Sequence, residues 1–330
     1  MSEAKPEKIL LIRMLGLGDV TCIGVSALRH FQQKFPDAEI HFLTYAAGSE
    51  VIKLAAPNVK QIVLEKGQWP ENILAAMEAF LGLAETIIGE AYTQIVNLDT
   101  WFMPCFLARF LKDAGEPVQG NFISKSVQQL IDEFQAQTLK PEYVNNPDTY
   151  MHSSWFGMSR WHMPWWEAGV TPEGGYPEFY LRHCCGFGAI EMDMTIDVNV
   201  DHQLKKQGKK QKIIALACDA RTAERGYPYG EELKRLLEEK GFYVWTGFDG
   251  SISMRDTLAK LKASHLLVTV PSAPQWLATS VGCPSLVISG QVDPRTLMPE
   301  YATDMSEEPV PAADLVESIE SIFEAEPCVH

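Results

Sequence analysis

Positive charge is scarce in this sequence. Its 330 residues include 28 Lys and Arg against 43 Asp and Glu, which gives a formal net charge of −15. Nucleic acids are bound through basic surfaces, so this balance argues against a nucleic-acid-binding protein. It argues equally against adsorption to an anionic membrane surface. If the ligand is itself an anion, the few basic residues that meet it must be gathered locally.

Long apolar runs and paired cysteines are also lacking. No stretch reaches the roughly 18 continuous apolar residues of a membrane span. The most apolar stretch, Asn72–Tyr92, is interrupted by glutamates and predicts a helix with one polar, solvent-facing side. The start, MSEAKPEK, is too polar for a signal peptide. The 7 cysteines are odd in number and mostly lie in apolar runs, so we expect reduced thiols and a cytoplasmic protein. No metal is expected at His183-Cys184-Cys185, which lacks zinc-ligand spacing.

Short apolar segments alternate with amphipathic ones in both halves of the chain. This alternation predicts βαβ units, parallel sheets and the α/β class. Strands are expected at 8–13, 39–44, 61–64, 93–98, 213–217, 242–246, 265–270 and 285–289, and helices at 230–240, 253–262, 271–281 and 312–324. The pattern weakens from 122 to 212, and the basic run 205–212 is the expected linker. We therefore predict two doubly wound domains, 1–185 and 186–330.

An aromatic cluster stands in the weakly patterned region. It consists of Trp155, Phe156, Trp161, His162, Trp165 and Trp166. Such side chains can form a carbohydrate-binding surface, or they can pack a region that is poor in regular structure. We favour packing, because apolar side chains are chiefly buried.

A glycine-containing loop, Leu15-Gly16-Leu17-Gly18-Asp19, follows the first predicted strand. Glycines permit a tight turn and close approach to a ligand, and a following helix offers free N–H groups. A nicotinamide-dependent dehydrogenase would need a third glycine where Thr21 stands and an acid after the second strand, which ends in Thr44-Tyr45. That function is disfavoured. Asp19 can serve as the N-cap of the following helix or as a general base, and the residues alone leave both open.

The residues around this loop also resemble a known family. Segment 8–20, KILLIRMLGLGDV, and segment 35–40, FPDAEI, are similar to the opening of glycosyltransferase family 9, the ADP-heptose:lipopolysaccharide heptosyltransferases and their relatives. In the second half, Arg225-Gly226-Tyr227-Pro228 resembles the family's K-x-W-P. Segment 263–294 resembles its stretch from A-D-L-x-V to G-x-x-D-P. The likeness covers about 8–100 and 211–300.

The resemblance implies the GT-B architecture, with two Rossmann-like domains facing across a cleft. The acceptor would lie on the N-terminal domain and the nucleotide-sugar on the C-terminal one. The implied reaction is an inverting, metal-independent transfer of a heptose-like sugar from a nucleoside-diphosphate sugar, an ADP-sugar, to a glycan or lipid-linked glycan, as in lipopolysaccharide core assembly. No cofactor is implied, and the protein would be cytoplasmic or peripheral to the inner membrane. The family's catalytic aspartate matches Asp19, with Gly16 and Gly18 as close-approach backbone beside it.

The resemblance also implies a donor site. The family's lysine that holds the diphosphate matches Arg225, whose guanidinium group can donate two parallel hydrogen bonds to phosphate oxygens. Arg221 and Thr222, in the same turn, would assist, and a merely solvated turn is the alternative. The backbone N–H groups of Ser272 and Ala273, at a helix N-terminus, would meet the diphosphate.

One segment departs from the family pattern. Pro271-Ser272-Ala273-Pro274-Gln275-Trp276 stands where the family has D-S-G-P-x-H, so the aspartate, glycine and histidine are absent. This departure motivates a second hypothesis, a catalytically degenerate relative that binds a nucleotide, glycan or protein partner without transfer. Trp276 could stack on a base or sugar, but its helical spacing favours a place in the core.

Overall fold

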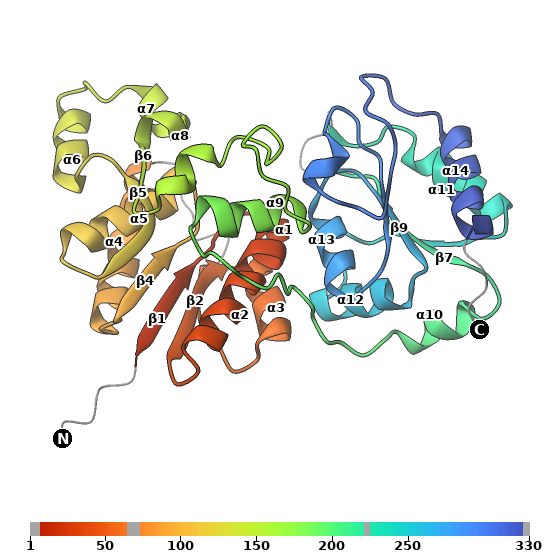
Figure 1. Cartoon of the computed structure of the whole chain (residues 1–330), viewed down its shortest axis with the longest axis horizontal. Coiled ribbons are helices and arrows are strands. Elements are labelled where there is room, and N and C mark those ends of the chain that lie inside the picture. Colours follow the sequence, from red (N-terminus) through yellow and green to blue (C-terminus); the bar gives the residue numbers. More distant parts are fainter. Residues whose placement is uncertain (1–6, 65–72, 221–224, 326–330) are drawn as a thin grey trace. The chain divides into compact units, whose positions relative to one another are not determined.

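The computed structural model describes residues 7–64, 73–220 and 225–325. The chain forms two compact units, and the boundary between them lies between Asp193 and Met194. The boundary predicted from the sequence lies between residues 185 and 186. Each unit contains one sheet and its own helices (Figure 1). The units are described separately.

The first unit is built on a six-stranded sheet in the order β3-β2-β1-β4-β5-β6. All neighbouring strands are parallel except β6, which runs antiparallel to β5. The strands are β1 (Lys8–Ile12), β2 (Glu39–Tyr45), β3 (Lys60–Leu64), β4 (Gln94–Asn97), β5 (Val118–Ile123) and β6 (Met151–Ser153). The helices are α1 (Leu17–Asp19), α2 (Val25–Lys34), α3 (Ala46–Ala55), α4 (Ile73–Gly89), α5 (Phe102–Asp113), α6 (Val127–Gln135), α7 (Pro141–Asn145), α8 (Pro147–Tyr150) and α9 (Gly175–Glu178).

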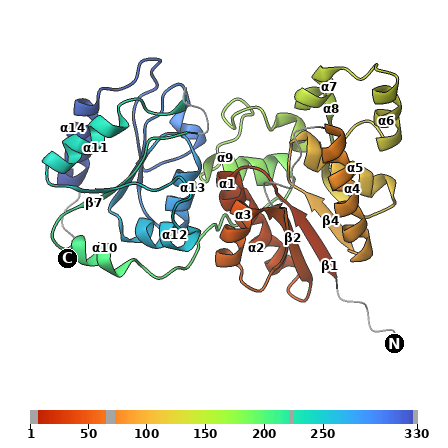
Figure 2. The same cartoon turned by 180° about the vertical axis from the view of Figure 1, so that it is seen from behind.

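Both faces of this sheet are covered, which explains why β1 reads as a continuous apolar run. Leu10 and Ile12 pack in one core cluster with Phe80 of α4 and Phe106 of α5. The other face lies under α2 and α3 (Figures 1 and 2), and there Phe42 approaches the backbone of the helix that follows β1. A parallel sheet buried on two faces needs apolar side chains at successive positions rather than alternate ones.

The second unit has a five-stranded sheet in the order β11-β10-β9-β7-β8, parallel throughout. Its strands are β7 (Ile213–Ala217), β8 (Tyr243–Trp245), β9 (Leu266–Thr269), β10 (Ser285–Val287) and β11 (Tyr301–Ala302). Its helices are α10 (His202–Gln207), α11 (Gly230–Glu239), α12 (Met254–Ala263), α13 (Ala273–Ser280) and α14 (Ala312–Ala325). Alternate β7 residues, Ile214 and Leu216, pack with Leu233 of α11 and Leu315 of α14. The predicted strands and helices of this half are confirmed to within a few residues.

The predicted linker is wrong. Helix α10, with Asp201 as its N-cap, occupies the beginning of the basic run 205–212 and belongs to the second unit. The Asp201 carboxylate accepts a hydrogen bond from the Leu204 N–H at 2.8 Å, so a capped helix forms where the lysines suggested a solvated connection.

The aromatic cluster has a mixed environment. Trp165 is buried, and Trp155 packs against Gly120 of β5 and against the Phe187 ring, as the packing interpretation predicts. Phe156, by contrast, is 96% exposed. Among the described helices, none combines the length and apolarity needed to cross a bilayer.

Candidate functional site

The first candidate site lies where the strand order of the first sheet reverses. After β1 the chain moves outward through β2 and β3, then returns to add β4 on the other side of β1. The segments that follow β1 and β4 therefore run in different directions from the carboxyl ends of these two strands. Ligands of open α/β sheets bind at such a switch point.

Asp19 is the last residue of α1, the short helix that follows β1, and its side chain caps no helix. The helix begins at Leu17 with Gly16 as its N-cap, and the Asp19 side chain makes no capping hydrogen bond. The capping interpretation is therefore wrong. A π-helical turn, Val20–Gly24, follows Asp19 directly, and such turns often occur at functional sites.

Gly16 is the glycine whose conformation this loop requires. Its φ is +79°, which L side chains rarely adopt. A Cβ on Gly16 would lie 2.9 Å from the Asp19 Oδ2 atom, so the close approach of the backbone is to Asp19 itself. Gly18 lies buried within the helix and is not among the positive-φ residues.

Arg13 holds the Asp19 carboxylate from inside the protein. It follows the last residue of β1 and its side chain is only 3% exposed, whereas the Asp19 side chain is 34% exposed. The Arg13 Nη2 group donates to Asp19 Oδ2, and Nη1 donates to the Leu98 carbonyl at 3.1 Å. Burial lowers the pKa of Arg13, but two neighbouring carboxylates together raise it well above its usual value.

The second carboxylate is Asp99, which follows β4 and is fully buried. Its Oδ2 accepts a hydrogen bond from the Met14 N–H at 2.5 Å, and its Oδ1 lies 3.5 Å from Arg13 Nη1 without a hydrogen bond. Burial raises the pKa of Asp99 to about 6, although Arg13 and the Met14 N–H favour its charged form. One buried guanidinium is thus shared between a buried and a partly exposed carboxylate.

Two tyrosines complete the surroundings of Arg13. The Tyr180 hydroxyl donates to the same Leu98 carbonyl that accepts from Arg13, and its ring centroid is 5.7 Å from the guanidinium. Tyr176 packs against Tyr180 at 5.7 Å between ring centroids. Burial raises the pKa of each tyrosine well above its usual value, so both stay neutral near pH 7.

The sequence reasoning missed Arg13 and Asp99. A usable signal was present, because each is a charged residue directly after a buried strand or one residue beyond it. The carboxyl ends of neighbouring parallel strands meet at one edge of a sheet. Charged residues in those two positions could therefore have been paired once β1 and β4 were placed side by side.

The second unit has its own switch point, between β7 and β9. Ala217 and Thr269, at the ends of these strands, lie opposite each other, and the Thr269 hydroxyl donates to the Ala217 carbonyl at 3.0 Å. The loop after β9 leads directly into α13. Of the predicted diphosphate residues, Ser272 and Ala273 follow β9, and Arg225 lies between β7 and α11.

Ser272 and Ala273 lie at the beginning of α13. Ser272 is the N-cap in an extended conformation, and its hydroxyl donates to the Val270 carbonyl at 3.0 Å instead of capping the helix. In the part of the chain that the structure describes, neither the Ser272 N–H nor the Ala273 N–H donates a hydrogen bond. Trp276 is buried, which confirms its expected place in the core.

The Arg225 side chain is exposed, and hydrogen bonds of Tyr227 hold the backbone beside it in place. Two residues later, the Tyr227 N–H donates to the Cys218 carbonyl at 2.8 Å and its hydroxyl donates to Val310 at 2.7 Å. Arg225 makes no ion pair with any other residue that the structure describes. Arg221 and Thr222 lie outside the described residues.

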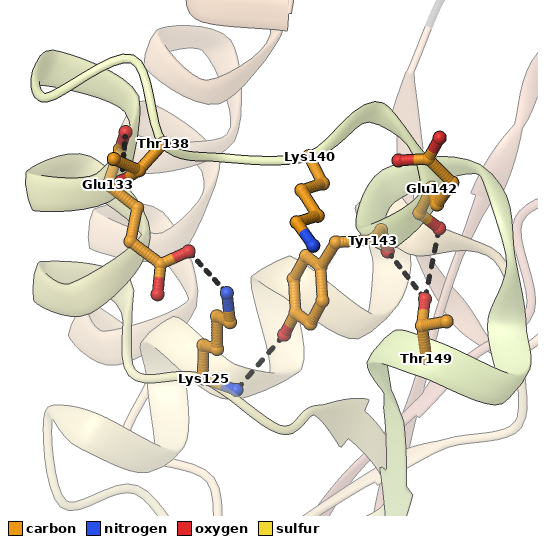
Figure 3. A pocket seen from close by; sticks show the side chains of 7 residues that line it. All are labelled: Lys125, Glu133, Thr138, Lys140, Glu142, Tyr143 and Thr149. Carbon is orange, nitrogen blue, oxygen red and sulfur yellow. Dashed lines mark hydrogen bonds and ion pairs between the residues drawn. The ribbon is translucent and has the colours of Figure 1, made fainter.

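A pocket of about 460 Å³ lies elsewhere in the first unit, among the segments after β5 (Figure 3). Most of its polar groups bond to one another. Lys125 pairs with Glu133 and stands over the Tyr143 ring, and the Thr149 hydroxyl donates to the Glu142 carbonyl at 3.0 Å. These satisfied groups indicate a structural role for the pocket lining.

In the part of the chain that the structure describes, no group of three or more His, Cys, Asp or Glu side chains is placed to hold a metal ion. Cys184 and Cys185 are both buried, and burial raises the pKa of each thiol.

No family model and no curated protein matches this sequence. Solved structures do match its fold. The glycosyl transferase family 9 structure from Veillonella parvula DSM 2008 matches with a TM-score of 0.58 and 14% identity, over 98% of this chain and 90% of that chain. The E. coli heptosyltransferase WaaC with ADP matches with a TM-score of 0.59 and 11% identity, over 95% and 99%.

A third structure, E. coli ADP-heptose lps heptosyltransferase II, matches with a TM-score of 0.58 and 12% identity, over 96% of this chain and 98% of that chain. At these identities the likeness shows the fold. The predicted fold class, α/β with two Rossmann-like units of the GT-B type, is confirmed. The resemblance to glycosyltransferase family 9 thus extends from short motifs to nearly the whole chain at the level of the fold.

Proposed function

We propose that this protein is an inverting, metal-independent glycosyltransferase that moves a sugar from a nucleoside-diphosphate sugar to a hydroxyl of a glycan acceptor. The observation that carries the proposal is Asp19, a partly exposed carboxylate held by a buried arginine at a switch point. One Asp19 oxygen is bound by Arg13, and no described group binds the other. That oxygen is free to accept a proton from an attacking hydroxyl.

The reaction needs a nucleophile, a base and a stabilised leaving group. The acceptor hydroxyl would attack the anomeric carbon of the donor sugar as Asp19 takes its proton. The bond from that carbon to the diphosphate oxygen breaks, and the nucleoside diphosphate leaves with the bonding electrons. Attack opposite the leaving group inverts the anomeric centre.

The second unit supplies groups suited to the leaving diphosphate. The Ser272 and Ala273 N–H groups stand at the positive end of α13, and Arg225 adds an exposed guanidinium. These contacts need no aspartate or histidine in segment 271–276. An ADP-sugar is the donor by analogy with E. coli heptosyltransferase WaaC, which was solved with ADP and, in a further structure, with ADP-2-deoxy-2-fluoro heptose.

Nucleotide binding is the first test. Thermal-shift titrations with ADP, UDP, GDP and NAD should show stabilisation by a nucleoside diphosphate, with ADP strongest. The shift should be lost in Arg225→Ala and kept in Arg235→Ala, which removes another exposed arginine of the same unit. Silence with all four nucleotides would refute the donor site.

The backbone contact can be tested without changing charge. Ala273→Pro removes one N–H at the first helical position, where proline is tolerated. We expect the Kd for ADP to rise about 10- to 150-fold, since a hydrogen bond to a charged group contributes about 1.5–3 kcal/mol. An unchanged Kd would place the diphosphate elsewhere.

Transfer itself tests the base. With an ADP-sugar and a glycan acceptor, Asp19→Asn should lower kcat by about 10²–10⁴ while ADP binding is kept. Asp37→Asn, an exposed aspartate of the same unit, is the matched control. ADP binding without turnover of any sugar donor would favour the degenerate, binding-only alternative.

A further inference from the structure

The buried carboxylate Asp99 has no role in the reaction as described so far. It is 0% exposed, one of its oxygens has no hydrogen bond, and its only described counterion is Arg13. Burying an ionisable group this way is costly unless its charge is compensated. Arg13 compensates it incompletely, because the same guanidinium also binds Asp19. The arrangement therefore requires an explanation beyond packing.

We infer that Asp99 is a positioning residue that acts on Asp19 through Arg13, by competing for the charge of the shared guanidinium. This inference rests on the proposed function, in which Asp19 is the base. When Asp99 is ionised, Arg13 is divided between two carboxylates and Asp19 remains a competent proton acceptor. When Asp99 is protonated, the full charge of Arg13 acts on Asp19 and weakens it as a base.

The geometry makes this coupling rigid. Asp99 Oδ2 is fixed by the Met14 N–H at 2.5 Å, in the same loop that carries Asp19. Arg13 is fixed by the Leu98 carbonyl at 3.1 Å, in the loop that carries Asp99. The segment after each strand thus holds the charged group of the other, and Asp99 and Arg13 cannot separate without breaking a backbone hydrogen bond.

Other groups near Asp99 do not interfere with its titration. Those that interact with it are Arg13, Asp19, Tyr45, Cys105, Tyr150 and Tyr180. Burial raises the pKa of Tyr45 to about 12, and it raises the pKa of Cys105, Tyr150 and Tyr180 as well. Between pH 4 and 8 these four stay neutral and Arg13 stays charged. A change near pH 6 that is lost in Asp99→Asn therefore reports Asp99.

The test combines a carboxyl signal with turnover. In protein with ¹³C-labelled aspartate carboxyls, the Asp19 resonance, identified by its loss in Asp19→Asn, should show a step centred near pH 6. The step should vanish in Asp99→Asn, which keeps an oxygen for the Met14 N–H. It should remain in Tyr180→Phe, which disturbs the same loop without changing charge. Absence of the step from the wild type overturns the inference, and that measurement needs no variant and no turnover.

Turnover gives the second readout. Asp99→Asn imitates the protonated state, so kcat should fall about tenfold, the order expected from one altered neighbouring charge. The wild-type loss of kcat below about pH 6 should disappear in this variant, and the KM for the donor should be unchanged. A merely structural role would lower kcat and leave the pH profile in place, which would overturn the inference. If no donor is turned over but the carboxyl step is present, the proposed function fails and the coupling stands.

Discussion

Arg13→Met offers the sharpest test of the buried charge cluster. The change keeps most of the side-chain volume but removes the counterion of Asp99, which would retain only the backbone N–H groups of Met14 and Leu15. Removing one partner of a buried ion pair costs about 3–5 kcal/mol, because an uncompensated charge is left in the interior. We expect a loss of this size in the free energy of unfolding at pH 7.

The magnitude should depend on pH in a defined direction. The pKa of Asp99 is about 6 in the folded protein and 3.8 in an ordinary carboxyl, so folding favours its protonated form. Without Arg13 this preference grows, and acid relieves the buried charge. The deficit of Arg13→Met should therefore shrink as the pH falls from 7 toward 4.

Urea unfolding followed by tryptophan fluorescence suits this measurement. Six of the eight tryptophans (69, 101, 155, 161, 165 and 166) lie in the first unit, so the signal reports mainly that unit. Arg235→Met, which breaks an exposed ion pair in the second unit, should leave the transition unmoved.

The double variant Arg13→Met with Asp99→Asn decides between explanations. Removing the stranded charge should recover at least about 1.5 kcal/mol relative to the sum of the single losses. If the two losses simply add, or if Arg13→Met costs less than about 1 kcal/mol, the charges do not depend on each other and the reasoning is refuted.

Three further predictions concern stability. Gly16→Ala should destabilise the protein by about 1–3 kcal/mol through its positive φ and should also displace Asp19. Gly115 has a similar φ of +91°, but a Cβ there would have no atom within 4 Å, so in circular-dichroism melts Gly115→Ala should show the effect of backbone strain alone. If Gly16→Ala and Gly115→Ala affect sugar transfer equally, displacement of Asp19 is excluded. Trp276→Ala should cost about 3–5 kcal/mol in urea unfolding, since the ring is buried, and a loss below about 1 kcal/mol would contradict its place in the core. Relative to Asp99→Asn, the wild type should lose about 2.4 kcal/mol of unfolding free energy as the pH rises from 4 to 7, because the folded pKa of Asp99 is raised, and a flat difference would exclude that shift.

Secondary structure and fold class were accessible from the sequence, because both follow from local patterns. Continuous apolar runs such as Ile213–Ala217 form strands buried on two faces. A glycine that can adopt a positive φ marks the end of a helix, and Gly241, at φ +89°, ends α11 as expected. The basic run 205–212 misled because charge composition says little about whether a capped helix such as α10 forms.

Only part of the candidate site could be predicted from the sequence. Its motif identified Asp19, whose neighbours in the chain suggested either a cap or a base. The structure excluded the cap, since Gly16 begins the helix and the Asp19 carboxylate binds Arg13 instead. A strong charged partner outweighs the modest free energy of a capping bond, and that partner is visible only when side chains are placed.

The sequence by itself determined which segments become strands and helices and where a reactive carboxylate could stand. Only the tertiary structure decided that residues 13 and 99 meet, because β1 and β4 become neighbours through a crossover rather than through proximity in the chain. The switch point is a property of strand order, which the local pattern of any one segment does not reveal. The guanidinium that Asp19 and Asp99 share is therefore formed only when these two strands have become neighbours.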